Sequence, residues 1–179
     1  MIKQFIAAAT LAATTLLAPA SAFASSSYQE HLHLANVIKS AGVSVYVNHP
    51  VCATTPGVLG MYSGERRGIV ICQENGTAGG AAVAWTEEDY DTLRHEAQHF
   101  IQDCMVGTSH DHVLGAVYKD PIALAASILS EEEAYRIVGR YQAQGATEQV
   151  LVLELEAFAV ARMNDPIEQA ADVARYCLG

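Results

Sequence analysis

Four cysteines constrain the fold of this chain more than any other feature, because all of them follow a segment typical of an export signal. Lys3 precedes the apolar run 5–17, and residues 22–24 form an A-x-A cleavage pattern, so we expect residues 1–24 to be removed. An even number of cysteines in an oxidising compartment is typical of disulfide bonds. We therefore expect a secreted or periplasmic protein with two disulfides.

Three disulfide pairings are possible among Cys52, Cys72, Cys104 and Cys177. We favour Cys52–Cys72, which would close a local hairpin-like loop, together with Cys104–Cys177, which would tie a distal segment to the middle of the chain. A cysteine zinc site is the alternative. No two cysteines, however, have the close C-x-x-C spacing that such sites usually show.

Size and charge limit the classes of partner. Residues 25–179 have the usual size of one domain and can bury a core, so we expect a single domain. The chain has a formal net charge of −10 at pH 7 and no cluster of basic residues, so nucleic acid is not an expected partner. The apolar run of the signal is shorter than the roughly 20 residues that span a bilayer. We therefore expect no membrane association after cleavage.

The first half of the chain is expected to form a small sheet. Apolar spacing predicts a helix over 28–40 that ends before Gly42. Alternation over 43–48 and β-branched residues over 67–73 predict two strands. The proline and glycine residues between them predict a loop over 49–66.

The second half is expected to be helical, because capping residues mark the starts of helices. Thr86, followed by three acids, predicts a helix over 87–105 that ends at Gly107. Further starts are indicated by four capping positions, which are Asp120-Pro121, Ser130, Thr147 and Asp165-Pro166. The sequence therefore predicts an α+β fold, with a small N-terminal β-hairpin or sheet packed on the helix 87–105 and a helical C-terminal half.

The segment His95-Glu96-Ala97-Gln98-His99 lies within the predicted helix and has the pattern H-E-x-x-H. Residues four apart share one helix face, so both imidazoles can reach one Zn²⁺ at about 2.0 to 2.1 Å. Glu96 lies beside that face, where it can act as general base toward a metal-activated water. The strand 67–73 could serve as the edge strand that binds an extended peptide. We therefore predict zinc-dependent hydrolysis of a peptide or protein substrate.

A hydrolytic zinc site needs a third protein ligand. Glu154 and Glu156 interrupt the otherwise apolar stretch 150–160. A helix that is apolar all round is buried, and a buried carboxylate is costly unless it is paired or binds a metal. The two glutamates lie about 200° apart around a helix, so at most one of them is expected to face the metal.

Glu154-Leu155-Glu156-Ala157, together with the H-E-x-x-H segment, resembles the gluzincin metallopeptidases, in which the glutamate of an E-x-x-A segment on a later helix is the third ligand. The resemblance implies that Glu154 is the ligand and that Ala157 lets two helices approach. Glu156 stays open as the alternative ligand, with Glu154 as its supporting acid. The chain departs from several such families at Phe158, where they carry an acid that orients a ligand histidine.

A further candidate ligand lies in the segment 107–111, Gly-Thr-Ser-His-Asp, which is similar to the Gly-Thr loop of the deuterolysin-like aspzincins. That resemblance implies Asp111 or His110 as the third ligand, although Asp111 lies one place later than the aspartate of that family. Hydrolysis also requires a donor that stabilises the oxyanion. The candidates for that role are His110, His112, Tyr135 and Tyr141.

A non-catalytic function is also compatible with the sequence. An exported binding module, either zinc-stabilised or metal-free, would have the same composition and could retain the same helix. The two functions differ in the surroundings of Glu96. A hydrolase needs this carboxylate free beside the metal, whereas a salt bridge, for instance with Arg94, would favour the binding module.

Overall fold

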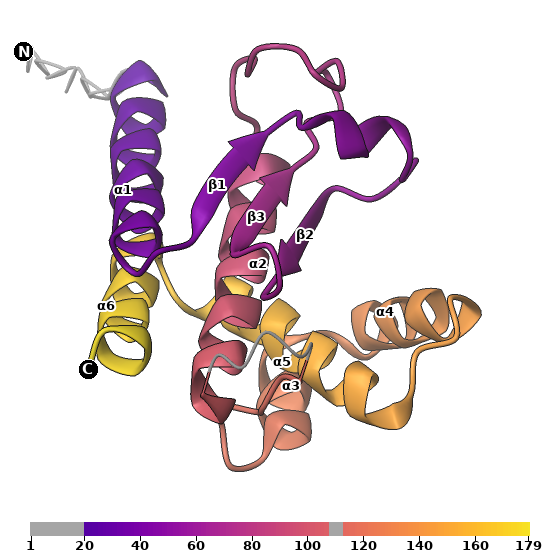
Figure 1. Ribbon diagram of the computed structural model, residues 1–179. Coiled ribbons are helices and arrows are strands. Elements are labelled where there is room, and N and C mark those ends of the chain that lie inside the picture. The colour runs from indigo at the N-terminus through magenta and orange to yellow at the C-terminus, as the bar shows by residue number, and fades with distance from the viewer. Residues whose placement is uncertain (1–19, 108–112) are drawn as a thin grey trace, which may run out of the picture.

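The computed structural model describes residues 20–107 and 113–179, which form an α+β fold as predicted (Figure 1). The elements are α1 (Ala20–Ser40), β1 (Ser44–Val47), the 3-10 helix η1 (Pro50–Ala53), β2 (Gly60–Ser63), β3 (Gly68–Ile71), α2 (Glu87–Val106), α3 (Pro121–Ile128), α4 (Glu131–Ala143), α5 (Glu148–Met163) and α6 (Pro166–Cys177). Most of the predicted export signal lies outside the described residues, and its predicted end falls within α1. The cleavage point therefore stays a prediction.

The three strands form one mixed sheet with the order β1-β3-β2. β1 runs parallel to β3, and β2 runs antiparallel to it. Two predictions are therefore wrong: the expected loop over 49–66 contains the strand β2, and the strand predicted over 67–73 is the central strand rather than an edge. β2 has only four residues and begins with a glycine, so it carries no recognisable alternation. Its extended form is stabilised by pairing with β3 and by contacts with α2.

The helix boundaries follow the capping residues that predicted them. α2 begins with a capping box, in which the Thr86 hydroxyl accepts from the backbone N–H of Asp89 and the Asp89 carboxylate accepts from that of Thr86. It ends at Gly107, whose φ of 97° is the left-handed conformation that glycine adopts at little cost. Thr147 caps α5, and Asp165 forms a second capping box at the start of α6.

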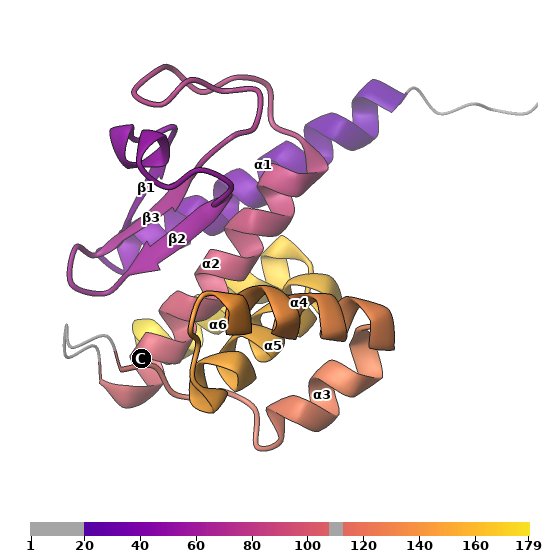
Figure 2. The same cartoon turned by 90° about the vertical axis from the view of Figure 1, so that its right-hand side faces the viewer.

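Figure 2 shows α2 between the sheet with α1 on one side and α3, α4 and α5 on the other, and each half has an apolar cluster. The first joins α1, the sheet, α2 and α6, and its fully buried members include Leu34, Ile38, Ile69, Ile71, Leu93, Phe100 and Val173. The second joins α3, α4 and α5 and contains Ala125, Leu129, Ile137, Leu155 and Ala159. α5 packs against both α2 and α3, so it connects the two halves of the structure. Among the described residues, we find no helix of the length and apolarity needed to span a membrane.

Both predicted disulfides are confirmed. Cys52–Cys72 joins η1 to the residue after β3, across a separation of 20 residues, and so closes the loop that contains the β2–β3 hairpin. Cys104–Cys177 joins α2 to α6 across 73 residues. No free cysteine is present, and this pattern is typical of proteins in oxidising compartments.

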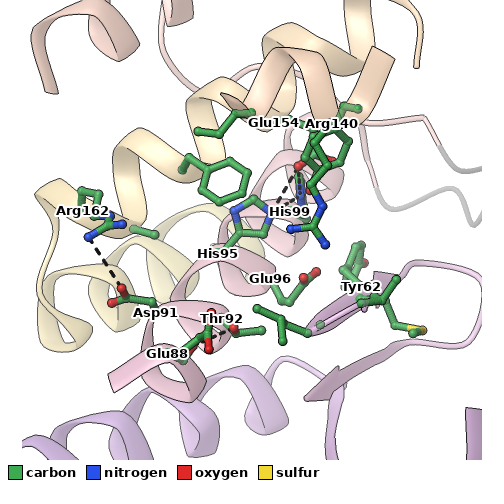
Figure 3. A pocket seen from close by; sticks show the side chains of 18 of the residues that line it. Tyr62, Glu88, Asp91, Thr92, His95, Glu96, His99, Arg140, Glu154 and Arg162 are labelled. Carbon is green, nitrogen blue, oxygen red and sulfur yellow. Dashed lines mark hydrogen bonds and ion pairs between the residues drawn. The ribbon is translucent and has the colours of Figure 1, made fainter. Parts of the chain in front are cut away.

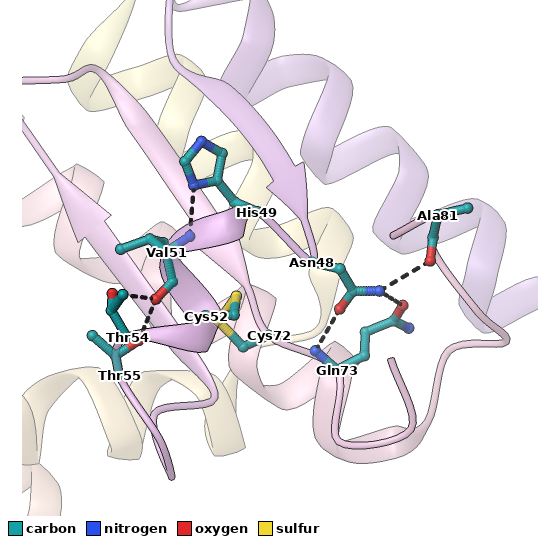
Figure 4. Close-up of a disulfide and its surroundings, with 9 residues drawn as sticks. All are labelled: Asn48, His49, Val51, Cys52, Thr54, Thr55, Cys72, Gln73 and Ala81. Atoms are coloured by element: carbon teal, nitrogen blue, oxygen red, sulfur yellow. Dashed lines mark hydrogen bonds between the residues drawn. A yellow bond between two sulfur atoms is a disulfide. The ribbon is translucent and has the colours of Figure 1, made fainter. Parts of the chain in front are cut away.

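A buried polar network beside the first disulfide fixes the connection from β3 to α2 (Figure 4). The Asn48 side chain donates to Gln73 Oε1 and to the carbonyl of Ala81, and it accepts from the backbone N–H of Gln73. Gln73 in turn donates to Asp89 in the capping box of α2. The start of α2 is thereby tied to the end of the sheet.

We expect the two disulfides to contribute differently to stability. The loop-entropy estimate is about 4 kcal/mol for Cys104–Cys177 and about 3 kcal/mol for Cys52–Cys72, because the first closes the longer loop. The paired variants Cys104→Ala/Cys177→Ala and Cys52→Ala/Cys72→Ala should lose free energy of unfolding in that order, as measured by urea titration. A peptide map of the unreduced protein serves as the control. Unchanged stability in the first variant would show that this disulfide does not constrain the unfolded chain.

Candidate metal centre

The packing of α5 on α2 brings three potential metal ligands together. Ala157 is fully buried and lies three residues after Glu154, on the same side of α5. On the same helix, Glu154 reaches the two histidines of α2 (Figure 3). Glu154 Oε2 lies 3.2 Å from His95 Nε2 and 3.4 Å from His99 Nε2, and the two imidazole nitrogens lie 3.0 Å apart.

This triangle of ligand atoms has the dimensions of a zinc site. Three atoms held tetrahedrally at about 2.0 to 2.1 Å from one Zn²⁺ lie about 3.3 to 3.4 Å from one another. The three observed separations, 3.0, 3.2 and 3.4 Å, are close to that value. His95, His99 and Glu154 are also the one group of three or more such ligands found within 4.8 Å of each other in the described part of the chain. One imidazole nitrogen from each histidine and one carboxylate oxygen form a donor set that zinc binds.

The hydrogen bonding of these atoms also fits a metal. Glu154 Oε2 is close to both imidazoles, yet it is buried and has no aligned hydrogen-bond donor among the residues described. A buried carboxylate oxygen without such a donor is costly. A cation at the centre of the triangle would satisfy it.

A hydrogen-bond chain orients His99. Its Nδ1 lies 2.8 Å from Gln102 Oε1, which can only accept, so Nδ1 carries the proton and Nε2 presents its lone pair to the centre of the triangle. The Gln102 amide nitrogen donates to Glu156 Oε1 at 3.1 Å and to the Leu153 carbonyl at 3.0 Å. Such outer partners fix the tautomer and the ring orientation of a metal-binding histidine.

Glu156, the alternative ligand, has a different environment from Glu154. Its side chain is completely buried and accepts from Gln98 Nε2 and Gln102 Nε2, and from the backbone N–H groups of Val117 and Tyr118. It is not part of the group around the two histidines. The structure thus places Glu154 with the histidines and Glu156 among hydrogen-bond donors that hold α2, α5 and the segment before α3 together.

The other sequence candidates are placed as follows. Asp111, His110 and His112 lie outside the described residues. Tyr141 lines the cavity at the metal centre, and burial together with the neighbouring Glu154 carboxylate raises the pKa of its hydroxyl. Tyr135 is 67% exposed and does not line this cavity.

The His95 ring packs against Phe158, and no described acid accepts a hydrogen bond from its Nδ1. Its ring lies 4.3 Å, between centroids, from the ring of Phe158, at an interplanar angle of 51°. His95 Nδ1 is buried and has no hydrogen-bond partner within the described ranges. The sequence departs from the gluzincin pattern at Phe158, and in the structure the ring of this residue contacts His95. An aromatic contact thus takes the place of an orienting acid.

Glu96 faces the same cavity from the side of the sheet. It is 5% exposed, and its carboxylate accepts from the backbone N–H of Tyr62 in β2. Burial raises the pKa of Glu96, and the two histidines and the Tyr62 N–H oppose that shift only in part. A Cβ atom at Gly60 would lie 2.7 Å from Glu96 Oε1, so the absence of a side chain there lets β2 approach the carboxylate.

The site opens into a cavity of about 650 Å³ between two walls. One wall is formed by α2 and by β2 with the residues just before it, and the other by α4 and α5. The free edge of β2 borders this cavity, because β2 is paired on its other side with β3. An extended chain could add to this edge directly beside Glu96.

The sequence reasoning missed two parts of this site. Gln102 belongs to no motif recognised in the sequence, yet its spacing of three residues from His99 places it on the same helix face. β2 was missed because a four-residue strand that contains a glycine resembles a loop. Contact with Glu96 is a tertiary feature that no local pattern records.

Comparison with known proteins places the chain in a family. Residues 22–178 match the model of a protein family described as "Domain of unknown function (DUF8637)". No curated protein and no solved structure matches the chain.

We expect the Gln102→Met substitution to lower zinc affinity about 10- to 100-fold, because His99 would lose the acceptor that fixes its ring. A competition titration against a chromophoric chelator would measure the change. Gln169→Met is the matched control, since Gln169 is also fully buried but donates to the carbonyl of Arg94. Equal losses of affinity in both variants would mean that Gln102 acts only through general stability.

The metal-free protein should lose stability as the pH rises from 6.5 to about 9. Burial favours neutral His99, but the adjacent Glu154 carboxylate, with a smaller effect of Glu96, raises the pKa of His99 to about 9. A pKa that is higher in the folded than in the unfolded protein contributes stability below the unfolded value, 6.5, and this contribution is lost as the pH passes the folded value.

The expected loss is at most about 3 kcal/mol, from urea titrations in the presence of a chelator. Glu154→Gln removes the carboxylate that raises the pKa, so its stability should change much less over the same pH interval. A wild-type curve as flat as that of the variant would contradict the prediction.

Proposed function

We propose that this chain, which belongs to the DUF8637 family, is a secreted or periplasmic zinc-dependent hydrolase that acts on peptide bonds. The observation that carries the proposal is the convergence of His95, His99 and Glu154 at distances that suit one zinc ion, with Glu96 beside them in the same cavity. The two disulfides fit the proposed location.

A bound Zn²⁺ would supply Lewis acidity, which lowers the pKa of water and polarises a carbonyl group. Glu96 would take a proton from the attacking water and deliver it to the leaving amine. The raised pKa of Glu96 suits this role, because a general base works best when its pKa approaches the working pH. Tyr141, whose hydroxyl lies at Glu154, is the described candidate for stabilising the developing oxyanion.

The exposed edge of β2 supports a peptide as the substrate. Cys72 N–H donates to the Leu59 carbonyl, and in an antiparallel pair the next residue along β2 directs its N–H and C=O away from the partner strand. Gly60 and Tyr62 therefore present backbone groups on the cavity side, in keeping with the bond from Tyr62 N–H to Glu96. A substrate in extended form could pair with this edge, with its scissile carbonyl near the metal.

The alternative is a non-catalytic binding module, which a salt bridge between Glu96 and a basic residue such as Arg94 would favour. Arg94 instead donates to the Ala161 carbonyl and contacts Asp91 and His31. No ion pair between Glu96 and a lysine or arginine occurs within residues 20–107 and 113–179. This observation favours the hydrolase.

Glu96→Gln keeps the side-chain shape but removes its basicity, so we expect zinc binding to persist while hydrolysis of a peptide library falls about 10²- to 10⁴-fold. Zinc content by mass spectrometry and cleavage by chromatography are the two measurements. Glu87→Gln, an exposed glutamate in the first turn of α2, is the matched control and should retain full activity.

Equal activity in Glu96→Gln and the wild type would exclude Glu96 as the base. Absence of cleavage by the wild type, with zinc bound by both proteins, would favour the binding module instead.

A further inference from the structure

The charges on the α4 wall of the cavity differ from those of the chain as a whole. The protein has 20 acidic residues against 10 lysines and arginines, yet three arginines line this one cavity. Arg136 and Arg140 belong to α4, and Arg162 belongs to α5. In the opposite wall, residues 58–62 carry no charged side chain, and its acids, which are Glu88, Asp91 and Glu96, all belong to α2.

Only one of these arginines is neutralised by acids. Arg162 lies 3.0 Å from a Glu133 carboxylate oxygen and 3.8 Å from one of Asp91. Arg140 donates to the carbonyl of Gly57 at 2.7 Å, which leaves its charge uncompensated. Arg136 is exposed and makes no ion pair with any residue that the structure describes. Two guanidinium groups are therefore available to an anion inside the cavity.

The guanidinium groups of Arg136 and Arg140 lie close enough to the metal centre to contact a substrate near its scissile bond. Arg140 precedes Tyr141, which contacts Glu154, and Figure 3 shows the Arg140 guanidinium directed into the cavity on the side of Glu154. Arg136 lies one helical turn, or about 6 Å, further along the same face. An extended peptide advances about 3.3 Å per residue, so a group one or two residues from the scissile bond can reach them.

We propose that Arg136 and Arg140 form a subsite for a carboxylate of the substrate, one or two residues from the bond that is cleaved. The inference rests on the proposed peptidase function and specifies its substrate class. A guanidinium group binds a carboxylate through two parallel hydrogen bonds. The positive charge of the arginine and the negative charge of the carboxylate would neutralise each other inside the cavity. The carboxylate is either the side chain of Asp or Glu or the C-terminal group of the peptide.

The acids in the cavity do not compete for these arginines. Asp91 and Glu133 pair with Arg162, Glu154 lies with the two histidines, and Glu96 accepts from the backbone N–H of Tyr62. Glu88 lies on the other side of the site from Arg140 in Figure 3. The carboxylate of the substrate is thus the charge that complements the α4 wall.

The test uses random hexapeptides with free or amidated C-termini and reads the cleavage sites by mass spectrometry. We expect wild-type protein to favour a carboxylate one or two residues from the cleaved bond by about tenfold. Arg136→Gln and Arg140→Gln should each reduce this preference, and the double variant should abolish it while retaining cleavage of uncharged sites. Arg66→Gln, an exposed arginine in the β2–β3 turn outside the cavity, is the matched control.

A second measurement does not depend on activity. Zinc-loaded Glu96→Gln protein should retain carboxylate-bearing peptides from the same library about tenfold better than their Gln or amide counterparts, and the arginine variants should lose this selectivity. Loss of selectivity on amidation would assign the subsite to the C-terminus, and loss on Glu-to-Gln exchange in the peptide would assign it to a side chain.

Failure of the two proposals can be told apart. If the wild type cleaves nothing, the peptidase function fails, and the retention measurement still decides on the subsite. Cleavage or retention without a preference for carboxylates would overturn the subsite, as would a preference that survives in the double arginine variant.

Discussion

The buried carboxylate of Glu156 is the interaction on which the rest of the site depends. It joins α5 to two glutamine side chains of α2 and to the backbone of the segment before α3. A buried carboxylate oxygen that loses its hydrogen-bond donor costs about 1 to 3 kcal/mol or more, so these elements are held firmly in one arrangement. Because Gln102 also accepts from His99, this anchor reaches the metal centre. One helix thus carries two acids with different tasks, since Glu154 converges with the histidines while Glu156 fixes the helices that carry them.

Burial opposes ionisation of both acids nearest the histidines, yet their pKa values shift in opposite directions. It acts against ionisation of Glu154, but the two imidazoles outweigh it and hold the pKa of this carboxyl well below its usual range. For Glu96 burial prevails, and its pKa is raised. The difference arises from position: Glu154 approaches the imidazole nitrogens directly, whereas Glu96 lies toward β2 and receives a backbone N–H. Two glutamates in one cavity thereby differ in the property that separates a metal ligand from a proton carrier.

Local patterns in the sequence predicted much of the fold and part of the site. Capping residues such as Thr86 and Asp165 fix helix starts through contacts within one turn, and for that reason they could be read directly. The favoured pairing of the cysteines followed from their positions along the chain, and the burial expected for residues 150–160 followed from their apolar composition. The separation of Glu154 from Glu156 required the packing angle of α5 on α2, which no short segment encodes. The edge position of β2 likewise depends on the strand order, in which β3 pairs with both β1 and β2.

The Cys104–Cys177 disulfide has a consequence for the assembly of the metal centre. The loop that it closes contains α3, α4 and α5, including Glu154, and it begins five residues after His99. A metal that bridged His99 and Glu154 would close a second loop, which overlaps the first over residues 104–154. Once the disulfide has formed, Glu154 samples a smaller volume, so its effective concentration near the histidines is higher. Thiol oxidation and the proposed metal binding would therefore be thermodynamically linked, each favouring the other.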